Sequence, residues 1–155
     1  MSHPGFRLRD ATRADLPAIV RMLADDPLGQ KRHRVEDPLP QEYYAAFDAI
    51  AASASNRLYV AEIAGEIVGT MQLTFIPGLD YLGAERMLIE AVRVARERRS
   101  AGLGKAMITE AIEVARRRGC QRVELTSSAS RTDAHRFYER LGFTASHVGM
   151  KLILK

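Results

Sequence analysis

The chain of 155 residues contains one cysteine, no tryptophan and four histidines. A single cysteine, Cys120, cannot form an internal disulfide or a metal site built from several cysteines. The four histidines are scattered, so we expect no metal. No apolar run approaches the roughly 20 residues that a membrane-spanning helix needs, and residues 1–5 lack the basic-then-apolar pattern of a secretion signal. We therefore expect a cytoplasmic protein with no membrane partner.

What the chain does contain fits one ordinary folded domain. Apolar residues make up 46% of the sequence and charged residues 27%, and the length suffices for a substantial core. No linker, repeat or low-complexity segment divides the sequence. We predict a single domain over residues 1–155.

The net charge of +4 comes mainly from arginines in residues 93–105, 116–118 and 131–140. Such a surface suits a phosphorylated small molecule or nucleic acid. For residues 116–118 the simpler interpretation is a solvated helix end, where cations complement the helix dipole. No basic stripe with interleaved aromatic residues is visible, so we expect no nucleic-acid partner.

Apolar spacing predicts alternating strands and helices. The predicted helices are 15–24, 40–53, 103–118 and 132–140, and the predicted strands are 6–9, 57–63, 66–75, 87–94, 121–126, 143–147 and 150–154. This order indicates a mixed α/β domain. We expect a largely antiparallel, twisted sheet of about seven strands flanked by about four helices.

Residues 94–105 form the most informative segment, because a strand leads through a loop with two glycines directly into a long helix. Free N–H groups at a helix start attract anions. Gly102 and Gly104 let the backbone approach a bulky phosphate, and Arg99 and Lys105 add positive charge. The pattern indicates a pyrophosphate site, although close helix–strand packing would also explain the two small residues.

Two motifs in this sequence resemble the GNAT acetyltransferase superfamily. Arg99-Ser100-Ala101-Gly102-Leu103-Gly104 matches the family's Arg/Gln-x-x-Gly-x-Gly/Ala signature, with Val94 five residues before the arginine. The segment from Ala134 to Phe143 is similar to the family's Ala-x-x-Phe-Tyr-x-x-x-Gly-Phe ending. The order and separation of the two motifs make the resemblance specific, and residues 7–15 are similar to the family's opening.

The resemblance implies the GNAT fold, in which the fourth and fifth strands splay apart, and acetyl-CoA as co-substrate. The pyrophosphate would bind the loop, and the pantetheine arm would pair with the fourth strand. The implied coenzyme-binding residues are Val92, Arg93, Val94, Arg99, Ser100, Ala101, Gly102, Leu103, Gly104 and Lys105. Where the family often has an asparagine after the fifth strand, this chain has residues 126–131, in which Ser128 and Arg131 are candidate contacts.

The resemblance also implies direct attack of an amine on the thioester, so Cys120 is expected to be a buried, inert thiol. Tyr138 matches the family's general acid, although it is also explained as an aromatic residue on a helix flank. Glu90 is the candidate general base, because a carboxylate in an apolar strand is costly unless it is paired or used. We expect it on the same side of the strand as Val92 and Val94. Three other interpretations of Glu90 stay open: an ion pair, substrate binding without proton transfer, and a proton relay through water.

We therefore predict an acetyl-CoA-dependent N-acetyltransferase acting on a primary amine of a small molecule or protein. The alternative is a non-catalytic acyl-CoA-binding or regulatory module. Asp25 and Asp26 are candidates for attracting a cationic amine, although they are also explained as solvated acids after a helix. The resemblance allows a homodimer in which residues 143–155 pair or exchange between copies.

Overall fold

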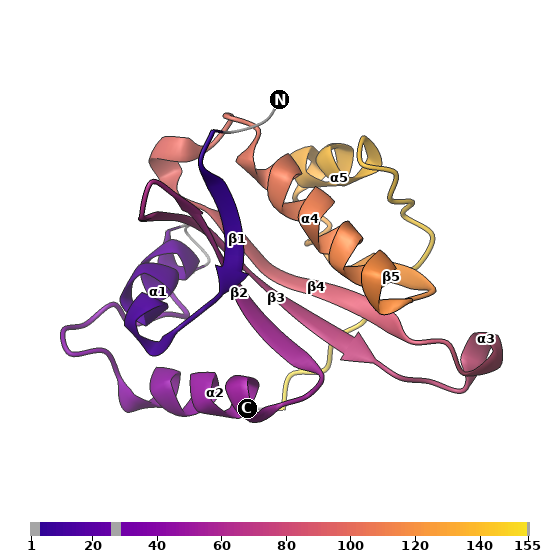
Figure 1. The fold of residues 1–155 in the computed structure, drawn as a ribbon, viewed down its shortest axis with the longest axis horizontal. Coiled ribbons are helices and arrows are strands. Elements are labelled where there is room, and N and C mark those ends of the chain that lie inside the picture. Colours follow the sequence, from indigo (N-terminus) through magenta and orange to yellow (C-terminus); the bar gives the residue numbers. More distant parts are fainter. Residues whose placement is uncertain (1–3, 26–28, 155) are drawn as a thin grey trace. The chain divides into compact units, whose positions relative to one another are not determined.

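The computed structural model describes residues 4–25 and 29–154, and the chain forms two compact units, Met1–Glu124 and Leu125–Lys155. The first unit is a sheet with helices on both faces (Figure 1). The helix of the second unit is α5 (Thr132–Glu139). A single domain over the whole chain stays a prediction.

The sheet has the strand order β1-β2-β3-β4-β5. Its first four strands pair antiparallel with their neighbours. The strands are β1 (Phe6–Asp10), β2 (Asn56–Ile63), β3 (Glu66–Ile76), β4 (Arg86–Val94) and β5 (Arg122–Leu125). Each begins and ends within one residue of its predicted bounds. β2 and β3 are joined by Ala64 and Gly65, both with positive φ, as a two-residue hairpin requires.

The predicted helices of the first unit are also present. They are α1 (Leu16–Ala24), which follows the 3₁₀ turn η1 (Arg13–Asp15), α2 (Gln41–Ala52) and α4 (Leu103–Arg118). A short turn, α3 (Asp80–Gly83), and the 3₁₀ turn η2 (Arg96–Arg98) are additional. Gly119 ends α4 in the left-handed conformation, as its sequence position predicts. No helix in residues 4–25 and 29–154 is long and apolar enough to cross a membrane.

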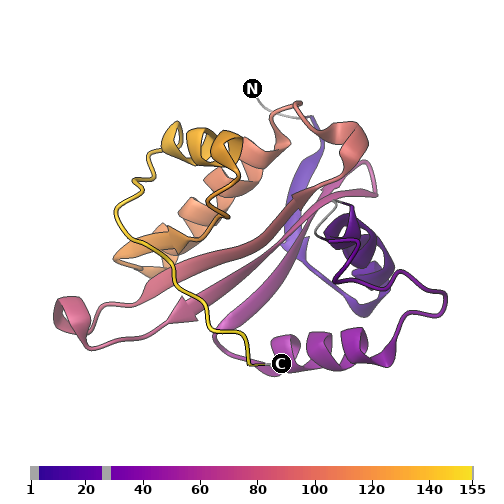
Figure 2. The ribbon, with the colours of Figure 1, turned by 180° about the vertical axis from the view of Figure 1, so that it is seen from behind.

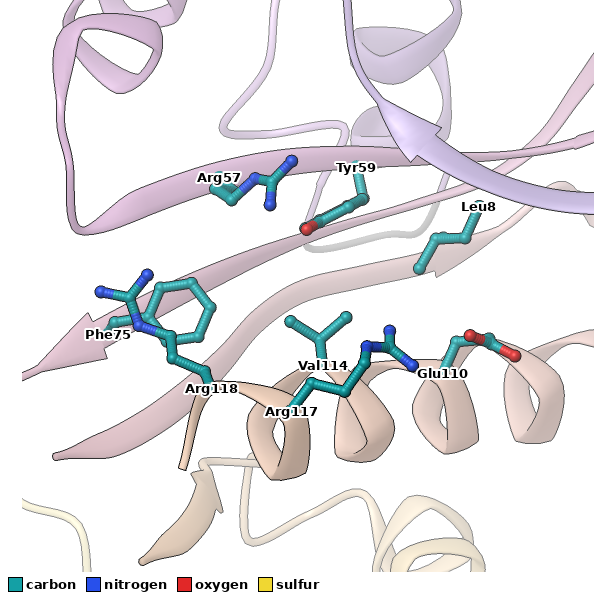
Figure 3. Close-up of a pocket in the computed structure, with 8 residues that line it drawn as sticks. All are labelled: Leu8, Arg57, Tyr59, Phe75, Glu110, Val114, Arg117 and Arg118. Carbon is teal, nitrogen blue, oxygen red and sulfur yellow. The ribbon is translucent and has the colours of Figure 1, made fainter. Parts of the chain in front are cut away.

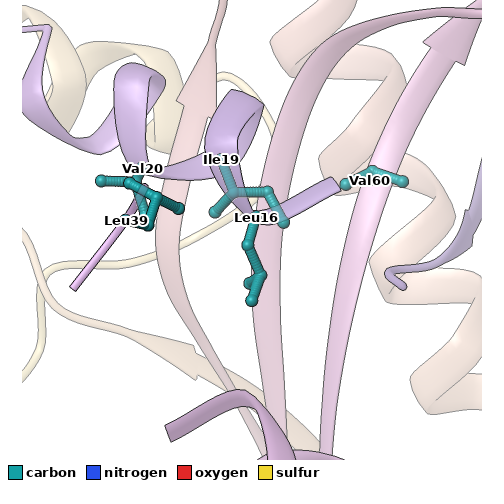
Figure 4. Close-up of a cluster of buried hydrophobic side chains, with 5 residues drawn as sticks. All are labelled: Leu16, Ile19, Val20, Leu39 and Val60. Carbon is teal, nitrogen blue, oxygen red and sulfur yellow. The ribbon is translucent and has the colours of Figure 1, made fainter. Parts of the chain in front are cut away.

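One face of the sheet is covered by α1 and α2 (Figures 1 and 2). Five side chains form the buried cluster there (Figure 4): Leu16, Ile19, Val20, Leu39 and Val60. They come from α1, from the segment before α2 and from β2. This cluster positions the two N-terminal helices against the sheet.

The opposite face is covered by α4, which packs closely on β3 and β4. A Cβ atom at Gly69 would lie 2.6 Å from Sδ of Met107, so a larger residue at this point would force the Met107 side chain to move. Met107, Ile108 and Ala111 are completely buried. The apolar stripe of α4 therefore faces the sheet, as its helical spacing predicts.

The last two predicted strands were wrong. Residues 143–147 and 150–154 form no strand in the structure. The backbone hydrogen bonds that Phe143 and Ser146 donate go to nearby residues, Tyr138 and Thr144. Alternating apolar residues are not sufficient for a strand, because its backbone groups also need a neighbouring strand as partner.

Candidate functional site

A β-bulge interrupts β4 at the centre of the candidate site. Thr70 on β3 pairs with Arg93, and Gln72 pairs with Glu90. Residues 91 and 92 therefore face residue 71 alone. Ala91 has φ 51°, in the left-handed region that a bulge residue often adopts.

The bulge changes which side chains share a face of the sheet. Glu90 lies on the face of its partner Gln72, whereas Val94 lies on the opposite face with its partner Gly69. The prediction that Glu90 and Val94 share a side was wrong, because strict alternation holds only in a strand without an extra residue. Glu90 therefore faces α1 and α2, and Val94 faces α4.

Glu90 belongs to a small polar cluster on the α1/α2 face. Oγ1 of Thr74 lies 3.3 Å from a carboxylate oxygen of Glu90 and 2.8 Å from Oδ1 of Asn56. Nε2 of Gln72 donates to the same Asn56 oxygen at 3.2 Å. The Glu90 side chain is exposed, which corrects the expectation of a buried carboxylate. Arg86, four residues before Glu90, pairs with Glu124 instead.

Sequence reasoning missed the other members of this cluster. The sequence of β3 contained a pattern that could have identified Gln72 and Thr74, because Thr70, Gln72 and Thr74 alternate there with apolar residues. That alternation places them on one face. Asn56 carried no such signal, because only the pairing of β2 with β3 brings it beside Thr74.

The loop before α4 presents a row of free backbone donors. Ser100 and Gly102 have φ 64° and 81°, and Gly102 is the N-cap of α4. Among the described residues, none of the N–H groups from Ser100 to Lys105 donates a backbone hydrogen bond; the first bond is from Ala106 to Gly102. The positive end of the helix dipole adds to these donors. These features would suit a bound anion, and the predicted pyrophosphate site stays a prediction.

The charge around this loop differs from the prediction. The Arg99 guanidinium donates to a carboxylate oxygen of Asp25 at 2.8 Å and to the Val94 carbonyl at 3.2 Å. Arg96 binds the same carboxylate. The hydrogen bond from Arg96 holds the pKa of Asp25 below its usual range, despite an opposing effect of burial. Asp25 therefore anchors arginines and is not free for a cationic amine, and Asp26 lies outside the described residues.

Lys105 is placed as predicted, with a positively charged side chain beside the loop. Its side chain is exposed and forms no ion pair within the described part of the chain. Lys105 is thus the cation beside the free N–H groups, while Arg99 serves chiefly to fix the loop to Asp25.

The end of β4 lies beyond the reach of β5. The N–H of Gln121 donates to the carbonyl of Glu85, so β5 starts beside the beginning of β4. A strand of four residues that starts there ends before Val92. The carbonyls of Val92 and Val94 accept hydrogen bonds from the side chains of Arg93 and Arg99. Each carbonyl oxygen has a second lone pair for another donor.

Three predicted site residues belong to the second unit. Tyr138 is half-buried, and its ring lies edge-on to Phe137 at 5.1 Å and to Phe143 at 5.9 Å. Oγ of Ser128 lies 2.9 Å from Oγ of Ser130. Arg131 is the exposed N-cap of α5. Their roles toward residues 90–105 stay predictions.

Cys120 has the surroundings of an unreactive thiol. It is half-buried, and its sulfur lies 3.7 Å from a carboxylate oxygen of Glu85. Burial, together with the Glu85 charge, raises the pKa of Cys120. A raised pKa disfavours the nucleophilic thiolate.

Comparisons with known proteins agree with this geometry. The sequence model of the acetyltransferase (GNAT) family matches residues 17–143. The chain is 37% identical to glucosamine 6-phosphate N-acetyltransferase of Trypanosoma brucei brucei over 103 residues, 66% of this chain and 68% of that protein. It is 27% identical to aminoalkylphosphonate N-acetyltransferase of Salmonella typhimurium over 150 residues, 93% and 88% of the two chains. A solved structure described as a transcriptional regulator from Bacillus halodurans has 48% identity and a TM-score of 0.93, covering 96% and 99% of the two chains.

Proposed function

Because the chain belongs to the GNAT acetyltransferase family, we propose that it transfers the acetyl group of acetyl-CoA directly to a primary amine of a small molecule or protein, within a ternary complex. The observation that carries this proposal is the row of free N–H groups from Ser100 to Lys105. A protein fold rarely leaves so many adjacent donors without acceptors unless a ligand or solvent binds them.

These donors would bind the pyrophosphate of the coenzyme, with Lys105 as the neighbouring cation. Backbone groups of Val92, Arg93 and Val94, which β5 does not reach, would pair with the pantetheine arm where β4 and β5 splay apart. Ser128 and Arg131 are proposed further contacts. When bound, acetyl-CoA supplies the activated thioester.

The protein must move two protons in this reaction. An alkyl amine is mostly protonated at neutral pH, so a carboxylate that accepts its proton favours attack. Glu90 would accept that proton, directly or through a water molecule, since it is exposed and hydrogen-bonded to Thr74. The Tyr138 hydroxyl would donate a proton to the departing thiolate and would recover one from the nitrogen, which loses its second proton as the amide forms.

The polar cluster around Glu90 suits a small amine that carries further hydrogen-bonding groups. Asn56, Gln72 and Thr74 line the same face as Glu90. Two relatives act, by their names, on amines that carry a phosphate or phosphonate. Such amines are the first acceptors to test.

The proposal predicts thiol release from acetyl-CoA in the presence of a suitable amine. Tyr138→Phe should lower kcat by about 100-fold with little change in KM for acetyl-CoA, and Glu90→Gln by roughly tenfold to 100-fold. Glu110→Gln removes the same charge on the other face of the sheet and should leave the rate unchanged. An unaltered rate in Tyr138→Phe would show that this hydroxyl is not the acid.

A second candidate is a regulatory module that binds acyl-CoA without turnover. It is favoured by the solved structure described as a transcriptional regulator. A thermal shift with coenzyme A, but no thiol release with any amine of a broad panel, would support the module over the enzyme. Absence of coenzyme A binding would contradict both.

A further inference from the structure

A pocket on the α4 face of the sheet has no part in the proposed acetyl transfer. It lies between the C-terminal half of α4 and strands β1, β2 and β3 and has a volume of about 370 Å³ (Figure 3). Cavities of this size are typical of small-molecule sites. At 1.5 Å rise per residue, Val114 in this pocket lies roughly 18 Å along the helix axis from Gly102. The pocket is therefore distinct from the candidate coenzyme site.

A tyrosine hydroxyl that no other described residue binds is directed into this pocket. Tyr59 is 6% exposed, and its oxygen points into the space between β2 and α4 (Figure 3). Within residues 4–25 and 29–154 this hydroxyl has no hydrogen-bond partner. Burial raises the pKa of Tyr59, against the opposing charge of Arg57, so the group is a neutral donor. The hydroxyl oxygen itself stays accessible from the pocket, so water or a ligand can bind it.

Two guanidinium groups are held in place at the same pocket. Nε and Nη2 of Arg118 donate to the Glu85 carboxylate at 2.7 and 3.1 Å, and the guanidinium lies 4.0 Å from the ring centre of Phe75. Arg57 donates from the same two nitrogens to Asp10 and lies 5.1 Å from the ring centre of Tyr59. In each arginine, Nη1 has no acceptor within the described part of the chain. In each case an aromatic ring and a carboxylate hold the guanidinium group in place before any ligand binds.

A third arginine supplies uncompensated charge. Arg117 lines the pocket and forms no ion pair among the described residues. Glu110, two helical turns earlier, also lines the pocket without an ion pair there. One free cation and one free carboxylate suit a ligand with a single negative charge better than a polyphosphate, which Glu110 would repel.

The remaining wall is apolar. Leu8 and Phe75 from the sheet and Val114 from the helix contribute it, and Phe75 is almost completely buried. A flat hydrocarbon group can lie against these side chains, because aromatic and aliphatic surfaces favour stacked contacts. The pocket thus combines an apolar wall with a polar end.

We propose that this pocket is a second ligand site, which binds a small aromatic carboxylate. The ligand carboxylate accepts hydrogen bonds from the Tyr59 hydroxyl and from arginine, and the aromatic part lies against Phe75 and Val114. Planar guanidinium groups match carboxylates in geometry. This site is independent of the acetyl transfer proposed above.

To test this proposal, the full chain is titrated with 2-naphthoate. Binding is measured by calorimetry and by changes in amide chemical shifts in NMR spectra. Saturable binding is expected, with shifts on β2 and the C-terminal half of α4. Tyr59→Phe and Arg117→Gln should each weaken binding by about tenfold or more. Arg116→Gln is the matched control, because Arg116 carries the same charge next in sequence but pairs with Glu113; it should bind like the parent protein.

Two further probes make the result decisive. The uncharged 2-naphthamide and inorganic phosphate should each bind far more weakly, because neither combines a carboxylate with an aromatic body. Coenzyme A should not displace 2-naphthoate. Equal binding of the amide, unchanged affinity in Tyr59→Phe, displacement by coenzyme A, or no saturation up to about 1 mM would each overturn the proposal. A thermal unfolding curve shows whether Tyr59→Phe is folded.

Discussion

At the scale of single residues, buried charge is concentrated at Asp15. Its carboxylate accepts hydrogen bonds from Arg9 at 2.8 and 3.0 Å and from the backbone of Thr12 at 2.7 Å. Arg9 also donates to Glu62 at 2.8 Å. The Asp15 side chain is 9% exposed, so solvent screens these interactions little. Together they join the end of β1 to the start of α1.

We predict that Asp15→Asn lowers the free energy of unfolding by about 2–3 kcal/mol at neutral pH. The hydrogen bonds from Arg9 hold the pKa of Asp15 below its usual value of 3.8. A lowered folded-state pKa stabilises the fold fully above that usual value, and the contribution disappears as the pH falls through the folded pKa. Urea unfolding at neutral pH and near pH 3 checks this, since the difference between variant and parent should shrink in acid.

The matched control for this prediction is Asp48→Asn. Asp48 also pairs with an arginine, Arg13, but the two side chains are 60% and 52% exposed. Exposed pairs contribute at most about 1 kcal/mol. Equal losses in the two variants would contradict the importance assigned to Asp15.

At the scale of elements, the bulge in β4 decides the arrangement of the candidate site. It puts Glu90 on the face of α1 and α2 and Val94 on the face of α4. The conformation comes with strain, because Ala91 has a positive φ of 51°, which costs an L-residue roughly 1–2 kcal/mol.

We predict that Ala91→Gly stabilises the protein by up to about 1 kcal/mol, because glycine adopts this conformation without strain. Ala84 lies just before β4 in an extended conformation with φ −71°. Ala84→Gly should therefore lower the free energy of unfolding by about 0.5–1 kcal/mol. Urea midpoints at constant m-value measure both changes. A loss of stability in Ala91→Gly as large as that in Ala84→Gly would show that the bulge is unstrained.

At the scale of the whole molecule, the C-terminal segment exposes an apolar surface. Five large apolar side chains there are between 76% and 92% exposed: Val148, Met150, Leu152, Ile153 and Leu154. Contiguous exposed apolar residues usually mark an interaction site. Among the residues that the structure describes, this segment also forms no strand and pairs with none.

We predict that a second copy of the chain covers this segment, giving a homodimer in solution. Ile153→Glu should shift the mass measured by light scattering from dimer to monomer, because it places a charge in a buried contact. Lys151→Gln alters the same segment without touching an apolar side chain and should leave the dimer intact. A monomeric parent protein at all concentrations would contradict this assignment.

The elements of this protein follow from local sequence. Period-2 and period-3.6 patterns predict β1 to β5 and the long helices, and Gly102 and Gly119 mark the two ends of α4. The free N–H groups of residues 100–105 are also local, because they follow from a loop that enters a helix. These features depend on neighbours a few residues apart, so the sequence alone was sufficient to predict them.

The tertiary structure determined which residues from distant parts of the sequence contact one another. The exposure and face of Glu90 depend on one extra residue in β4, and the pairing of Arg99 with Asp25 joins segments that are 74 residues apart. The pocket at Tyr59 is formed by residues of β1, β2, β3 and α4, which only the tertiary structure brings together. Such contacts are set by packing and strand register, whose energies depend on distant partners, and therefore no local pattern contains them.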